Sequence, residues 1–300
     1  MCYCSILALS MLLPTGVESS FLSSASSSSS FVSHQSNNQL FCEKGDRIDF
    51  SFKRLQVDPP QNAKEMEPND VAETIEKLLR GQGEEASQEA FIGSMDAWMV
   101  AFNKAKRGKE RAVMYGSKLE GVLTLMEKNA RDGSTVDAYA TVMHLYLSEK
   151  EPFRALRVLG RMEKQLLTQE EGGNIEGFID VKGRLIQYNR VLQGLASSSE
   201  SSSLQVAFHL LMSMCLQERF TCPDVVPFAP TNVKPDSKSF ATVLSAMLAE
   251  NDGSETDILS LIKQAKNFDQ LSGFLMKKME RAIGGDKERL DLLIQRSSSL

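Results

Sequence analysis

Apolar residues recur every three or four positions along most of the chain after residue 70, and this is the spacing of an amphipathic helix. In the stretch ETIEKLLR, for example, Ile75, Leu78 and Leu79 fall on one face. The strict alternation of apolar and polar residues that a half-buried strand needs is nearly absent. The pattern therefore predicts an all-α body over residues 70–300.

One aromatic-led helical template occurs four times in this body. Its aromatic residue is followed by large apolar or aromatic residues four and seven positions later, as in FATVLSAM. The four aromatic anchors are 48 to 52 residues apart: Phe91, Tyr139, Tyr188 and Phe240. Each anchor helix precedes a second amphipathic segment. Two of these segments, GVLTLMEK and RVLGRMEK, have Val-Leu at the same distance before a shared Met-Glu-Lys ending. The chain thus reads as a series of helical hairpins.

A hairpin with an apolar face on each helix cannot bury both faces alone, whereas stacked hairpins can. We therefore expect an α-solenoid of about four helical hairpins. The segments GFLMKKMERAIGG and KERLDLLIQR are expected to close it as capping helices.

The first nineteen residues look like a signal peptide. Ile6–Leu13 form a short apolar core, and Val17-Glu18-Ser19 places a small residue at a candidate cleavage position. No Lys or Arg precedes the apolar core, so the positive start of an ordinary signal peptide is missing.

Residues 20–69 read as a Ser-rich, transit-like segment followed by a linker. No acidic residue lies between Glu18 and Glu43. Together with residues 1–19, the segment resembles the bipartite plastid-targeting leaders of algae with complex plastids, where the transit part starts at a Phe, here Phe21. Five cysteines without a Cys-x-x-Cys motif favour a reducing compartment. The prediction is a plastid protein cleaved near Ser19 and Phe21; secretion and a mitochondrial location remain the alternatives.

The net charge of −5 counts against a protein whose whole surface binds nucleic acid, but it leaves room for a basic stripe. The run KAKRGKER supplies candidate phosphate contacts: Lys104, Lys106, Arg107, Lys109 and Arg111. The alternative for this run is a solvated surface loop.

The sequence offers little for catalysis. His34, His144 and His209 do not cluster with the cysteines, and no glycine-rich phosphate loop follows a strand. We expect no metal site, no cofactor and no enzymatic activity. Trp98, seven residues after its anchor, is expected in the core.

The segments VKPDSKSFATVLSAML, LIQYNRVLQGL and ALRVLGRMEK resemble the pentatricopeptide repeat, in which a Lys-Pro-Asp turn precedes a helix led by an aromatic residue. The resemblance covers roughly residues 88–268. The units are longer than the 35 or so residues of the family, and the chain has the array without the metallonuclease domain found beside a similar array in protein-only ribonuclease P.

The resemblance implies binding of single-stranded RNA in an organelle. In the family a base is read by the residue after the anchor together with the residue four before the next anchor. In the third unit these positions hold Asn189 and Asp236, whose amide and carboxylate can both reach a base edge. In the second unit they hold Ala140 and Arg184. Asp236 is also a good helix N-cap, so capping is the alternative for this residue.

A second interpretation fits the same helices. A tetratricopeptide-like scaffold would hold a protein partner on its concave face and act as an assembly factor. The net acidity favours this alternative, and the Tyr-Asn and Lys-Pro-Asp motifs favour RNA. The oligomeric state is not predicted.

Overall fold

The structure, a computed structural model, describes residues 52–54, 56, 65–83, 86–106, 110–129, 135–171, 181–200, 202–250 and 254–298. These belong to one compact unit that starts at Cys42. The predicted leader, residues 1–19, and most of residues 20–69 lie outside the described residues.

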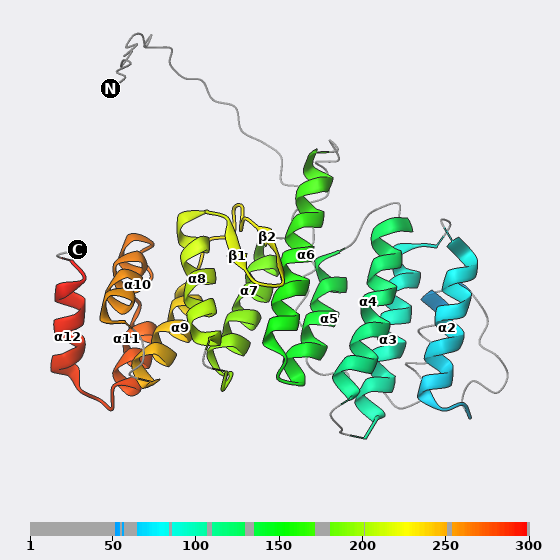
Figure 1. Ribbon diagram of the computed structural model, residues 1–300, viewed down its shortest axis with the longest axis horizontal. Coiled ribbons are helices and arrows are strands. Elements are labelled where there is room, and N and C mark those ends of the chain that lie inside the picture. Colours follow the sequence, from blue (N-terminus) through cyan, green and yellow to red (C-terminus); the bar gives the residue numbers. More distant parts are fainter. Residues whose placement is uncertain are drawn as a thin grey trace, which may run out of the picture. The chain divides into compact units, whose positions relative to one another are not determined.

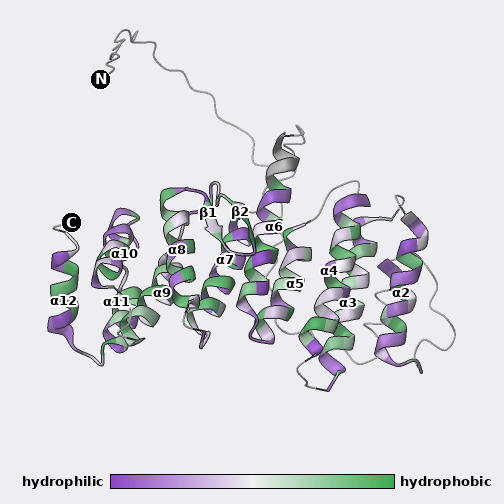
Figure 2. Cartoon of the chain, in the orientation of Figure 1, coloured by the Kyte–Doolittle hydropathy of each residue, from purple (hydrophilic) through white to green (hydrophobic). Residues whose placement is uncertain are grey.

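The described body is mostly helical, as predicted (Figure 1). The helices are α2 (Pro68–Gln82), α3 (Gln88–Lys104), α4 (Arg111–Asn129), α5 (Val136–Ser148), α6 (Pro152–Glu171), α7 (Val181–Ala196), α8 (Ser203–Leu216), α9 (Ser237–Glu250), α10 (Glu255–Asn267), α11 (Gly273–Ala282) and α12 (Lys287–Arg296). Most carry hydrophobic and hydrophilic residues on different faces of one ribbon, as Figure 2 shows.

Side-chain caps fix where several helices begin. Ser87, Thr135 and Ser272 each accept a hydrogen bond from the backbone N–H three residues later, at the starts of α3, α5 and α11. Asp286 does the same for α12, and α2 opens on Pro68, whose missing N–H costs nothing there. The residues at these positions therefore determine where the helices begin.

Consecutive helices pack in pairs, and the four anchor helices also pack on one another. α3 contacts α5, α5 contacts α7, α7 contacts α9, and α9 contacts α11. The anchors lie inside this row, since Phe91 is 1% exposed and Tyr139, Tyr188 and Phe240 are fully buried. All four belong to the same hydrophobic core cluster, in which Trp98 also lies, 2% exposed, as predicted.

A small β-hairpin follows α8, where no strand was expected. Strands β1 (Phe220–Cys222) and β2 (Val225–Phe228) pair antiparallel around a turn in which Asp224 adopts a φ of 60°. The physical reason is local: a Pro-Asp turn separates two short runs that are rich in β-branched and aromatic residues.

The β-hairpin packs against two second helices of the pairs. β2 contacts α6, and β1 contacts α8. Gly160 of α6 allows the close approach, because a Cβ at this position would lie 3.0 Å from both the Val226 carbonyl oxygen and the Phe228 ring. Phe228 in turn meets the edge of Tyr188, with ring centroids 6.3 Å apart. The extra length of the third unit therefore contributes to the core.

The body also extends upstream of residue 70. Phe52, which lies in the predicted linker, is fully buried in the core cluster. Next to it, the Arg54 guanidinium donates to the Asp96 carboxylate of α3 at 2.9 Å. At least this part of residues 20–69 is therefore packed onto the helices.

Candidate functional site

The predicted pair Asn189 and Asp236 meets where α7 lies against the start of α9. The Asn189 side-chain N–H₂ donates to the Asp236 carboxylate, with Nδ2 3.2 Å from Oδ1 and 3.4 Å from Oδ2. Asn189 is 5% exposed, and Asp236 is partly exposed. Two residues 47 positions apart, selected from the base-reading positions that the pentatricopeptide resemblance implies, thus lie in direct contact.

Asp236 is also the N-cap of α9, which confirms the capping interpretation. Its Oδ1 accepts the Ser239 backbone N–H at 2.8 Å, and the Asp236 N–H donates back to the Ser239 hydroxyl at 3.1 Å. This is the reciprocal arrangement of a capping box. Oδ1 therefore serves both the α9 cap and Asn189, while the contact given for Oδ2 is the longer one to Asn189.

Ser239 completes the site, and the sequence analysis missed it. Its hydroxyl donates to the side-chain amide oxygen of Asn189, Oδ1, at 2.6 Å, and the serine is fully buried. The available signal was the spacing Asp-x-x-Ser at a helix start, which indicates a capping box. Asn189 is thus oriented from both ends of its amide, and its role in base contact stays a prediction.

The helices around this pair carry exposed cations. α7, described along its whole length, contains no Asp or Glu, and its Lys182 and Arg190 are exposed. Lys234 and Lys238 flank Asp236 and are exposed too. On α11, the predicted capping helix that packs against α9, three further exposed cations occur: Lys277, Lys278 and Arg281.

The opposite charge pattern marks the preceding anchor helix, α5. α5, also described throughout, contains Asp137 and no Lys or Arg. His144 of α5 has its pKa lowered below 6.5, first by partial burial and then by the positive charge of Arg190. These exposed cations of α7, of the start of α9 and of α11 are called the basic stripe below.

The five predicted phosphate contacts are not equivalent. Lys104 and Lys106 are exposed, and Arg107 and Lys109 lie outside the described residues. Arg111 is only 10% exposed in its side chain and caps α3, because its Nη2 donates to the Phe102 carbonyl oxygen at 2.6 Å. Its guanidinium carbon lies 3.8 Å from the centre of the Phe102 ring. Arg111 is thus held inside the fold, unlike the two lysines.

The shared Met-Glu-Lys segments place two glutamates in matching positions. Glu127 of α4 accepts from the Tyr139 hydroxyl at 2.7 Å and from Arg161. Glu163 of α6 pairs with Arg184, and its charge, after burial, helps to raise the pKa of Tyr188. Each glutamate thus sits beside the next anchor tyrosine and is neutralised by an arginine.

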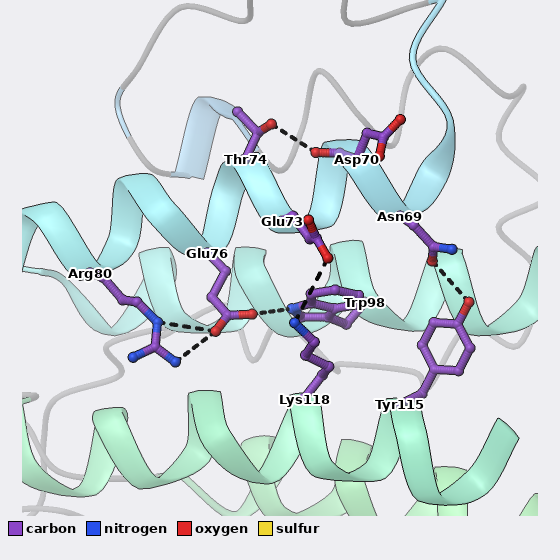
Figure 3. A network of polar contacts seen from close by, with 9 residues as sticks. All are labelled: Asn69, Asp70, Glu73, Thr74, Glu76, Arg80, Trp98, Tyr115 and Lys118. Carbon is purple, nitrogen blue, oxygen red and sulfur yellow. Dashed lines mark hydrogen bonds and ion pairs between the residues drawn. The ribbon is translucent and has the colours of Figure 1, made fainter. Parts of the chain in front are cut away.

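The first helices are fixed by a polar network rather than by an open site (Figure 3). Glu76 of α2 accepts the Trp98 indole N–H at 3.0 Å and pairs with Arg80. The Tyr115 hydroxyl of α4 donates to Asn69 at 2.8 Å. Because these hydrogen bonds link α2 to both α3 and α4, they act as structural ties.

Two further properties concern the described residues as a whole. Among them, no three His, Cys, Asp or Glu side chains gather closely enough to hold a metal ion. Over the same part of the chain, no helix is both long enough and apolar enough to cross a bilayer.

Comparison with known proteins gives no family for this chain: neither protein-family models, nor curated proteins, nor solved structures match it.

Proposed function

We propose that the chain is a non-catalytic α-solenoid that binds single-stranded RNA along α7, α9 and α11. The observation that carries the proposal is the contact of Asn189 with Asp236 among exposed cations on the same helices. A cationic stripe attracts phosphates whatever the sequence, and an amide next to a carboxylate can read a base edge.

The solenoid part of the proposal is supported by the packing. Each anchor helix contacts the next one, from α3 to α11, as in stacked hairpins that share a continuous core. The buried anchors and the matching positions of Glu127 and Glu163 are what a degenerate repeat would preserve.

Base reading at this site requires an exchange of partners. On binding, the Asn189 amide would turn its N–H₂ from the Asp236 carboxylate to a base acceptor, and Asp236 Oδ2 would accept a base donor. Oδ1 would keep the α9 cap through the Ser239 N–H. The resemblance to pentatricopeptide repeats implies uracil for this pair, whose edge offers one N–H between two carbonyl oxygens.

The test is RNA binding by the full chain across a salt series. We expect the logarithm of affinity to fall linearly with the logarithm of salt concentration, with a slope proportional to the number of phosphates bound. Replacing Lys182, Arg190 and Lys238 by Gln should weaken binding, and the slope should decrease by about one for each phosphate that the variant no longer binds.

The matched control is Lys128→Gln with Lys164→Gln, which removes two exposed cations from the second helices α4 and α6. This variant should bind RNA like the parent protein. Absence of binding at low salt, or an equal decrease of affinity in both variants, would contradict the proposal.

One observation favours the protein-scaffold alternative. Ile186 of α7 and Phe274 of α11 are 43% and 51% exposed, so the same helices offer apolar side chains to a partner. A scaffold would lose its partner when these two residues are replaced by Ser, with little dependence on salt. RNA binding would depend on salt strongly.

A plastid location is the proposal for the leader, residues 1–19 with the Ser-rich segment after it. A fluorescent protein fused behind residues 1–45 should accumulate in plastids of an alga with complex plastids. Export of the fusion from the cell would favour the secretory alternative.

A further inference from the structure

A cavity opens where α3 and α5 end and α4 begins. Its volume is about 420 Å³, enough for a small planar ligand. Six residues line it: Phe102, Asn103, Arg111, Ser148, Glu149 and Lys150. None of them belongs to the stripe on α7, α9 and α11, so the cavity is a separate feature.

Arg111 presents an unused donor to this cavity. Its guanidinium is fixed by stacking over Phe102 and by the bond from Nη2 to the Phe102 carbonyl oxygen. Its Nε is buried and has no hydrogen-bond acceptor among the described residues. A buried N–H without an acceptor is costly, so an acceptor from outside the described residues, such as a bound ligand, would be favourable here.

Glu149 places an acceptor next to that donor. Its Oε1 lies 3.6 Å from Arg111 Nη1, which is beyond a good hydrogen bond, so the two groups are neighbours without satisfying one another. The carboxylate side chain is 22% exposed and lines the same cavity. On one wall of the cavity, the Glu149 carboxylate, which only accepts hydrogen bonds, therefore lies beside the Arg111 guanidinium, which only donates them.

Guanine is the nucleobase whose edge matches this wall. It carries two adjacent donors, N1–H and N2–H₂, that can bind both oxygens of one carboxylate, with the acceptor O6 next to them. Adenine and cytosine offer a single donor group beside an acceptor, and uracil offers a single N–H between two acceptors. A phosphate alone would meet the repulsion of Glu149.

We propose that this cavity binds a guanine base, with Glu149 accepting from N1–H and N2–H₂ and Arg111 donating to O6. Lys150 follows α5 with a φ of 61° and lines the cavity, and exposed Lys104 and Lys106 follow Asn103 on the other side. These lysines would contact a phosphate attached to the base. The guanine comes either from a free nucleotide or from guanosine in an RNA strand, and the second source rests on the proposed function.

The test is calorimetric titration of the full chain with GMP, AMP, CMP and UMP. GMP should bind on the order of ten-fold or more tightly than the other three, the discrimination expected of one bidentate pair. Glu149→Gln should abolish that preference, because one of the two acceptor oxygens becomes an N–H₂ group, which faces a guanine donor with another donor. Unchanged thermal unfolding of the variant would show that its fold is intact.

Glu151→Gln is the matched control, since Glu151 is two residues away, lies outside the cavity and pairs with Arg154. It should bind GMP like the parent protein. Equal binding of all four nucleotides, or a GMP preference that survives Glu149→Gln, overturns the proposal.

Further titrations with RNA distinguish a free nucleotide from guanosine in a strand, and they distinguish the guanine site from the proposed RNA binding. If a U-rich RNA with one guanosine binds more tightly than GMP, and Glu149→Gln removes the advantage of that guanosine, the base comes from RNA. If GMP binds and no RNA does, the proposed RNA function fails and the guanine site stands. If RNA binds and GMP does not, with no effect of Glu149→Gln, the guanine site alone is wrong.

Discussion

Glu163 of α6 and Arg184 of α7 form a bidentate ion pair with almost no access to solvent. The two side chains are 0% and 3% exposed, and Arg184 Nε lies 3.0 Å from Glu163 Oε1, with Nη2 on the second oxygen. Each charge compensates the other inside the core, so the pair should behave as a unit.

The pair predicts a strongly non-additive mutant cycle. Arg184→Met alone should lower the free energy of unfolding by about 3–5 kcal/mol, because it strands a buried carboxylate. The double variant Arg184→Met, Glu163→Leu should recover most of that stability, since both charges are gone. Urea denaturation of the two single variants and the double variant measures the cycle, and additive effects would contradict the prediction.

Two glycines of α4 should respond in opposite directions to the same substitution. A Cβ on Gly116 would lie 2.5–2.7 Å from the Tyr146 hydroxyl and ring, and this ring is held by its hydrogen bond to Glu120. Around Gly121, nothing in the described part of the chain lies within 4 Å of such a Cβ. Gly121→Ala should stabilise by about 0.5–1 kcal/mol through helix propensity.

Gly116→Ala should instead destabilise by about 1–3 kcal/mol through overpacking. Thermal unfolding of the two variants, compared with the parent, checks both signs. A stabilising Gly116→Ala would show that the Tyr146 ring can move aside.

His144 should make stability depend on pH in the acidic range. Its folded-state pKa lies below 6.5, so the unfolded chain binds the proton more tightly. The contribution is fully present above pH 6.5 and is lost as pH falls toward the folded pKa. NMR titration should place its pKa below 6.5, and Arg190→Gln should raise it only part of the way, because burial is the larger cause.

Two substitutions of Asp236 can distinguish its role as the N-cap of α9 from its proposed role in base reading. Asp236→Ala should cost about 1–3 kcal/mol, since it removes the cap and leaves the buried Asn189 amide short of an acceptor. Asp236→Asn should keep most of the stability, because an Asn side chain also caps. If Asp236→Asn keeps stability and changes the RNA preference at a single base, the carboxylate has the base-reading role as well.

Periodicity and spacing predicted the parts of the fold that depend on neighbouring residues. The anchors are buried because an aromatic residue followed by apolar residues four and seven positions later defines one helix face. Asn189 and Asp236, which the structure brings into contact, were selected from the resemblance to the pentatricopeptide repeat, and their direct contact was not predicted. The ion pair of Glu163 with Arg184 was not predictable, because it depends on a distant partner that the local pattern does not reveal. The β-hairpin was missed although its signal is local, a Pro-Asp turn between two short runs of β-branched and aromatic residues.

Only part of the candidate site was predicted. The resemblance identified the amide and the carboxylate, whereas Ser239 was missed although the Asp-x-x-Ser spacing at the start of α9 indicates it. Arg111 counted as one more charge in a basic run, and only tertiary packing against Phe102 and Glu149 distinguishes it from Lys104 and Lys106.

The burial of Phe52 limits how this chain can mature. A peptidase that removed the predicted leader together with Phe52 would take a fully buried aromatic side chain out of the core, at a cost of about 3–5 kcal/mol by analogy with Phe→Ala substitutions. It would also remove Arg54, the partner of Asp96. Any trimming of the N-terminus that leaves the body intact must therefore stop before Phe52.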